Sequence, residues 1–178
     1  ELEDLGGLEE RFCLANNYAV ALMEVKDDRE TAMKLLQGVL LESRRKLGDN
    51  DPSTLESMVN LSMQYTEMSQ FEKALPLATE AFEGMRRTAG PEHPHTLVAM
   101  HGLASLYAAM HDYEKAKPLH DECLAARRRT LGKSSSETME SMSGLGHCLV
   151  AMQGDVARGI ALLAEAAATA RRVLGPGH

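Results

Sequence analysis

The chain repeats itself with a period of 42 residues. Gly48, Gly90 and Gly132 are separated by this interval, and each follows an arginine pair at a fixed offset. Three other residue types keep the same frame: Thr54, Thr96 and Thr138; Leu61, Leu103 and Leu145; Met58, Met100 and Met142; Met68, Met110 and Met152. Such a period indicates one supersecondary unit that buries its apolar face only by stacking on copies of itself. The period therefore favours a binding surface over a catalytic pocket.

Each unit has the pattern of two helices. After Asp51-Pro52, apolar residues from Leu55 to Met68 recur every three or four positions, which is one face of a helix. A second helix is predicted from Phe71 to the arginine pair, where Gly90 supports its end. We expect an all-α chain of about eight helices in one array over residues 1–178. Its helix-turn-helix units are about 8–48, 51–90, 93–132 and 135–175.

The first unit and the chain end depart from the regular pattern. Leu14 and Tyr18 match Leu61 and Tyr65 at a distance of 47, which indicates five residues inserted around positions 24–29 and predicts a longer turn there. Residues 174–178 copy the start of another unit, so we expect a piece of a longer array. An array without a polar end cap exposes apolar surface, and self-association through the C-terminal end is a further expectation.

Charge and composition narrow the partner class. The net charge is −7 and the pI about 5.5, which argues against a nucleic-acid partner. No apolar run reaches 18 residues, so no membrane span is expected. Three cysteines without a CxxC pair fit reduced thiols and a cytoplasmic location. No nucleophile, phosphate-loop or metal motif is present, so we expect no enzyme activity, metal or cofactor.

The motif Leu-x-x-x-Tyr in the first helix of a unit, with a small residue after the Leu, resembles the tetratricopeptide repeat. The longer period and the inter-repeat sequences 47–55 and 89–97 resemble the arrays of kinesin light chains and nephrocystin-like proteins. This resemblance implies a right-handed superhelical solenoid of about four repeats. It also implies that the first helix of each repeat lines a concave groove for a protein or peptide.

The groove candidates are polar or flexible residues of the first helices that lie off the packing stripe: Asn16, Asn60, Met63, His101, Ser105, Ser143 and His147. Residues 56–66, 98–108 and 140–150 contain no Lys or Arg. A carboxylate clamp for peptide C-termini is therefore not expected. We expect hydrogen bonds to a peptide backbone and shallow apolar pockets, since Asn both donates and accepts.

Several alternatives stay open at this point. The arginine pairs are either a basic stripe or structural partners of the helix ends and of loop acids. Two series of methionines recur with the period, and we call them the methionine ladders: Met58, Met100 and Met142, and Met68, Met110 and Met152. They form either an adaptable binding surface or, as we favour from their spacing, part of the core. The function is peptide binding or, alternatively, that of a scaffold subunit that docks through its convex face or open ends. An RNA-binding helical repeat is a third candidate, disfavoured by the acidic charge.

Overall fold

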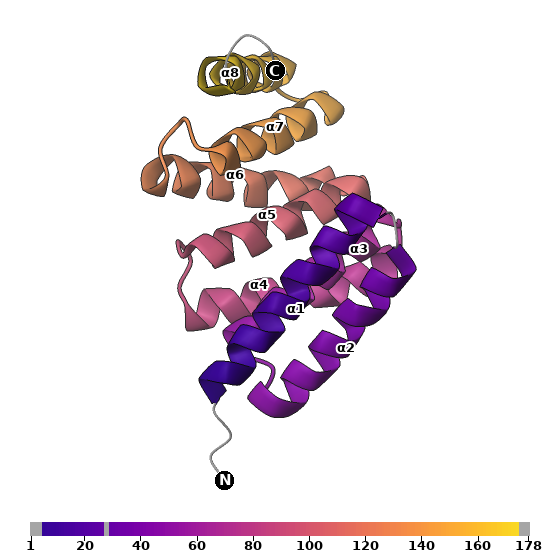
Figure 1. Ribbon diagram of the computed structural model, residues 1–178. Helices are drawn as coiled ribbons and strands as arrows, with labels where there is room; N and C mark the ends of the chain where they lie inside the picture. The colour runs from indigo at the N-terminus through magenta and orange to yellow at the C-terminus, as the bar shows by residue number, and fades with distance from the viewer. Residues whose placement is uncertain (1–4, 27–28, 175–178) are drawn as a thin grey trace. The chain divides into compact units, whose positions relative to one another are not determined.

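The computed structural model describes residues 5–26 and 29–174, and these ranges form eight α-helices and no strand (Figure 1). The predicted all-α class and helix number are confirmed. The chain divides into two compact units, Glu1–Gly90 and Pro91–His178, each holding two of the expected helix pairs. The single continuous array stays a prediction. The turn residues Asp27 and Asp28 and the repeat-like segment 175–178 lie outside the described residues.

Unit 1 consists of α1 (Leu5–Lys26), α2 (Arg29–Leu47), α3 (Pro52–Glu67) and α4 (Phe71–Thr88). Helix α3 packs on its hairpin partner α4 and also on α2 and α1 of the preceding repeat. Leu36, Leu55 and Met58 are fully buried at the centre of this unit. Gly84 permits the close approach of α3 and α4, because a Cβ there would lie 2.5 Å from Leu55 Cδ2.

Unit 2 repeats this plan with α5 (Pro94–Ala109), α6 (Tyr113–Thr130), α7 (Ser136–Ala151) and α8 (Val156–Leu174). Helix α7 packs on α8 and on α6, and it also contacts α5. Gly146 and Gly159 lie back to back where α7 meets α8, since a Cβ at Gly159 would lie 2.9 Å from Gly146 O. The small residue that the repeat motif requires after Leu145 is thus explained by helix packing.

The residues that end and begin the helices recur with the 42-residue period, as the core residues do. Asp51, His93 and Ser135 are N-caps 42 residues apart, and their side chains accept from the backbone amides of Ser53, His95 and Thr138. The loop glycines Gly48, Gly90 and Gly132 have φ of 91°, 97° and 81°, a region that glycine enters without steric cost. This geometry explains why glycine marks every repeat boundary.

The two methionine ladders differ in burial. Met58, Met100 and Met142 are fully buried, so the core interpretation is confirmed for them. It is wrong for Met68, which is exposed, and for Met110 and Met152, which are half-buried. Each of these three is the C-cap of the first helix of its repeat, where the chain turns away from the core.

The register predicted for the first repeat is wrong. Leu14 and Tyr18 are exposed, whereas Asn16, Ala19 and Leu22 are buried. Helix α1 continues to Lys26 and α2 begins at Arg29, so helix fills most of the segment expected to be a long turn. Leu22, not Tyr18, occupies the place of Tyr65. A slip of four residues changes the helical phase by only about 40°, so apolar spacing does not reveal it.

Two of the four arginine pairs, Arg44-Arg45 and Arg128-Arg129, have carboxylate partners in the structure. In unit 1, Arg44 of α2 pairs with Glu80 of α4 and with Asp49 in the loop. In unit 2, Arg128 of α6 pairs with Glu165 of α8 at 2.9 Å, and Arg129 pairs with the loop residue Glu92. The first arginine thus connects the second helix of one repeat to the second helix of the next. This geometry supports the structural alternative over a free basic stripe.

Candidate functional site

A cleft of about 570 Å³ lies among α5, α7 and α8 of unit 2 and contains three of the predicted groove residues, His101, Ser105 and Ser143. We call it the unit 2 cleft. Helix α7 adds Ser136, Met139 and Glu140, and small or apolar residues of α8 form the opposite wall. That wall consists of Leu163, Ala166, Ala167 and Ala170. No arginine or lysine lines the cleft.

The other four predicted residues lie elsewhere. Asn60 is half-buried and Met63 is exposed on α3 of unit 1, and His147 is exposed on α7 outside the cleft. Asn16 is fully buried, and its Nδ2 donates to Ser57 Oγ of α3 at 2.8 Å. Its amide connects two repeats and is not accessible to a peptide in this structure. The next residue, Asn17, is exposed. Successive residues of a helix point in directions 100° apart, so one of two adjacent asparagines is buried while the other faces solvent.

His101 is the polar centre of the unit 2 cleft. Its ring lies edge-to-face on the buried His120 ring, with centroids 5.3 Å apart. Burial, followed by the positive charge of Arg127, lowers the pKa of His101 to about 4, and the same two causes lower the pKa of His120 to about 4. Both imidazoles are therefore neutral at pH 7. His101 Nδ1 has no hydrogen-bond partner among the described residues.

Two serine hydroxyl groups of the cleft donate their hydrogens within the protein. Ser143 Oγ donates to Met139 O at 3.0 Å, so its lone pairs are left to accept from a ligand. Ser136 Oγ donates to the Glu137 carboxylate at 3.0 Å. Neutral acceptors beside an apolar wall suit the N–H groups of a peptide backbone better than a charged terminus.

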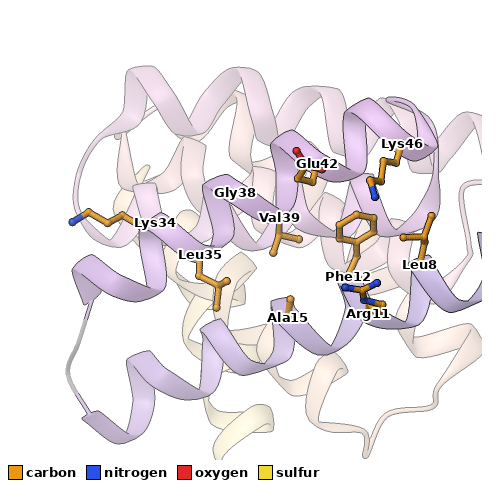
Figure 2. A pocket seen from close by; sticks show the side chains of 10 residues that line it. All are labelled: Leu8, Arg11, Phe12, Ala15, Lys34, Leu35, Gly38, Val39, Glu42 and Lys46. Atoms are coloured by element: carbon orange, nitrogen blue, oxygen red, sulfur yellow. The ribbon is translucent and has the colours of Figure 1, made fainter.

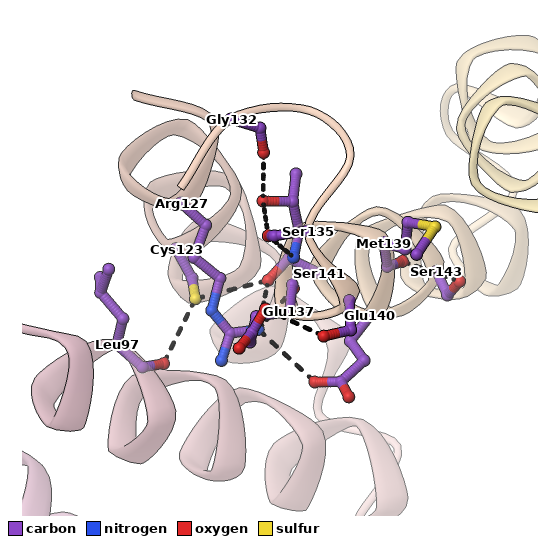
Figure 3. Close-up of polar contacts among 12 residues, drawn as sticks. Leu97, Cys123, Arg127, Gly132, Ser135, Glu137, Met139, Glu140, Ser141 and Ser143 are labelled. Carbon is purple, nitrogen blue, oxygen red and sulfur yellow. Dashed lines mark hydrogen bonds and ion pairs between the residues drawn. The ribbon is translucent and has the colours of Figure 1, made fainter. Parts of the chain in front are cut away.

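A buried polar network, which the sequence reasoning missed, supports the α7 side of the cleft (Figure 3). Arg127 Nη1 donates to Glu137 O at 2.6 Å and to Ser141 Oγ at 2.9 Å, and it lies 3.7 Å from the Glu140 carboxylate. Cys123 Sγ approaches Leu97 O at 3.4 Å, and burial raises the pKa of its thiol. The network joins α5, α6 and the start of α7.

One sequence signal could have revealed this network. The third repeat carries three consecutive arginines, Arg127 to Arg129, where the other repeats carry a pair. The equivalent positions in the first and second repeats hold Ser43 and Met85, both buried. An extra charge at a buried register position predicts a local polar partner.

Within the described residues, no group of three or more His, Cys, Asp and Glu is placed to bind a metal ion. None of the helices, as far as their residues are described, has the length and apolar character needed to cross a bilayer.

Comparison with known families matches two tetratricopeptide repeat models to this chain. One matches residues 10–87, 59–129 and 96–155, and the other matches residues 138–178. The chain belongs to the tetratricopeptide repeat family. No curated protein matches it. The expectation drawn from the Leu-x-x-x-Tyr motif and the inter-repeat sequences is confirmed at the level of the family.

Several solved structures share the fold. A kinesin light chain-like protein of Podosopora anserina with nearly identical TPR-like repeats is 24% identical, with a TM-score of 0.81 over 96% of this chain and 80% of that one. A single-residue variant of it matches equally well. BtubC (BKLC) from P. vanneervenii is 20% identical, with a TM-score of 0.78 over 94% of this chain. This chain spans 65% of the length of BtubC. The helical repeat solenoid fold is thereby confirmed.

Proposed function

We propose that this tetratricopeptide repeat chain is a non-enzymatic interaction module that binds an extended peptide in the unit 2 cleft. Tetratricopeptide repeats are generally protein-interaction modules. The observation that carries the proposal is the convergence of His101, Ser105 and Ser143, from two first helices, on one cleft with an apolar wall. These neutral groups offer hydrogen bonds to a backbone, and the small α8 side chains leave room for ligand side chains.

Recognition in this cleft depends on hydrogen bonds and apolar contact. His101 is neutral at pH 7, and no Lys or Arg lines the cleft. Glu140 is the one charged residue among the described residues of the lining, and it is largely exposed, so we expect affinities of micromolar order, about −8 kcal/mol, with only a weak dependence on salt. Asn60, Met63 and His147 stay proposed contacts outside the cleft, while the groove proposal assigns no contact to the buried Asn16.

A library of random peptides displayed on phage, selected against the immobilised chain, provides the test. Selected peptides are measured against the wild type, Ala167→Trp, which fills the cleft, and Ala161→Trp, a control on the exposed side of α8. Ala167→Trp should weaken binding at least about tenfold, while the control should not. Equal binding by both variants excludes the unit 2 cleft.

A scaffold role is the second candidate function, and α8 favours it. Ile160 and Val173 of α8 are exposed, as expected of a helix on which another chain packs. Sedimentation equilibrium separates the candidates: association that grows with protein concentration and is lost in Ile160→Glu supports the scaffold.

The proposed function also includes a reducing compartment and no nucleic-acid partner. Cys123 and Cys148 are free buried thiols, and the net charge of the chain is −7.

A further inference from the structure

A second cleft, of about 430 Å³, lies between α1 and α2 of unit 1, which supply all the described residues that line it (Figure 2). On α2, Gln37 and Arg44 face α3, where they contact Tyr65 and Met58. Gly38 lies about 100° further around α2 than Gln37, on the open side. No predicted groove residue lines this cleft.

The floor of this cleft is apolar and continues into exposed apolar surface. Tyr18 of α1 and Leu41 of α2, each three residues beyond a lining residue, are 60% and 68% exposed. When Leu22 is aligned with Tyr65, Tyr18 is aligned with Leu61. Leu61 is buried in the second repeat, whereas Tyr18 is exposed in the first. The floor residues are Leu8, Phe12, Ala15, Leu35 and Val39. We call this surface, with the cleft, the N-terminal face; apolar surface of this kind marks interaction sites.

The rim of the cleft is predominantly positive. It carries Arg11, Lys34 and Lys46, and Glu42 is the one carboxylate among the described residues that line it. Glu42 is bound by Arg45 at 2.9 Å, and Lys34 is bound by Glu30 at 2.6 Å. Among the described residues, Arg11 and Lys46 form no ion pair with a carboxylate, although Lys46, after Arg45, helps to lower the pKa of the Glu42 carboxyl. The face is therefore apolar with excess positive charge, on a chain of net charge −7.

At this face, α2 lacks the carboxylate that later repeats present to the arginine of the preceding repeat. Glu80 and Glu165 accept hydrogen bonds from Arg44 and Arg128 of the preceding repeat. The equivalent residue of the first repeat, 42 positions before Glu80, is Gly38. A preceding repeat of this kind would thus find no acceptor for its arginine.

Charge also argues against a second copy of the chain. Its exposed end helix, α8, carries Arg171 and Arg172 in the last turn. These cations would oppose the positive rim, and like charges brought together across an interface are unfavourable.

We propose that the N-terminal face binds an amphipathic helix of a partner protein whose apolar stripe is flanked by carboxylates. One apolar side chain of that helix enters the notch over Gly38, where no atom lies within 4 Å of an added Cβ. Carboxylates on either side of its stripe reach Arg11 on α1 and Lys46 on α2. This is a helix-in-groove mode of recognition, separate from the unit 2 cleft.

The test uses three fluorescein-labelled helical peptides of about 15 residues, a length at which a helix forms with suitable sequence. The first has Leu at positions i, i+4 and i+7 with Glu on both flanks. The second replaces every Glu by Lys, and the third replaces every Leu by Ser. Fluorescence anisotropy with the full chain should detect the first peptide, with binding about tenfold or more weaker for the other two. Equal binding of the Glu and Lys peptides overturns the proposal.

Two variants locate the site. Gly38→Glu fills the notch and adds a carboxylate at the position equivalent to Glu80. Lys46→Glu reverses one charge of the rim. Each variant should bind the acidic peptide about tenfold or more weakly than the wild type. His101→Ala in the unit 2 cleft should leave this binding unchanged, which separates the two proposals. Gly38 is exposed in mid-helix, so helix propensity favours the Glu variant, and circular dichroism checks its fold. Unchanged binding by both variants, or a concentration-dependent dimer that Gly38→Glu abolishes, overturns the proposal.

Discussion

Arg127 of α6 donates from Nη1 to Ser141 Oγ of α7 at 2.9 Å, and Arg127 is only 2% exposed. A buried guanidinium is costly unless each of its hydrogen bonds is made, so this contact ties the two repeats of unit 2 to one geometry. The Glu140 carboxylate that it also approaches is itself largely exposed. Unit 1 fills the same position with the apolar Met85.

Arg127→Ala and Arg127→Met should therefore differ. The Ala variant leaves Ser141 Oγ and Glu137 O without their donor and opens a cavity, so the free energy of unfolding should fall by about 3 kcal/mol. The Met variant copies the second repeat and should recover at least half of that loss. Urea denaturation of both variants gives the comparison, and equal destabilisation would show that packing does not compensate for the lost charge.

Stability should depend on pH through His101 and His120. Their pKa values are about 4 in the folded protein against 6.5 in the unfolded chain, so the unfolded state binds protons first. Their contribution is fully present above pH 6.5 and is lost as the pH falls toward 4. Between pH 7 and 5 the free energy of unfolding should drop by about 2 kcal/mol per imidazole.

Matched variants assign this pH dependence. His120→Leu copies Leu36 and Leu163, which hold the equivalent positions in the first and fourth repeats, and should reduce the drop between pH 7 and 5 by about half. His147→Gln, at an exposed site, should leave it unchanged. NMR titration of the two rings gives the same answer independently. A pKa near 6.5 for either ring would contradict the assignment.

Gly144 should tolerate no larger residue while His120 is present. A Cβ at Gly144 would lie 2.6 Å from His120 Cε1, so Gly144→Ala should cost about 1–3 kcal/mol by overpacking. Gly102, 42 residues earlier, has no atom within 4 Å of an added Cβ. Gly102→Ala should instead stabilise α5 by about 0.5–1 kcal/mol. Thermal unfolding measures both changes, and combining Gly144→Ala with His120→Ala should relieve the clash.

The Arg44–Glu80 pair should contribute little to stability. Both side chains are partly exposed, and such pairs are typically worth about 0.2–1 kcal/mol. A double-mutant cycle with Arg44→Ala and Glu80→Ala should give a coupling energy in this range that shrinks in 1 M salt. Coupling well above 1 kcal/mol would mean that the pair determines the repeat geometry and does not merely accompany it.

The 42-residue period by itself determined the helices, their order and the family of this chain. A helix depends on hydrogen bonds between residues four apart, and its caps and breaking glycines, such as Asp51 and Gly48, act within a few residues. Local sequence therefore carried this information. The core ladder of Met58, Met100 and Met142 was predictable for the same reason, because its spacing is the period of the fold.

Only tertiary structure decided which polar residues are accessible. Asn16 and Asn17 are adjacent and chemically identical, yet one is buried against Ser57 and the other is exposed. Arg127 differs from its neighbours Arg128 and Arg129 only in the direction of its side chain, which α7 covers. Burial depends on residues distant in sequence, and a four-residue slip in α1 preserves the apolar pattern while changing every partner. Accessible and buried positions on a helix face thus follow from the packing of neighbouring repeats.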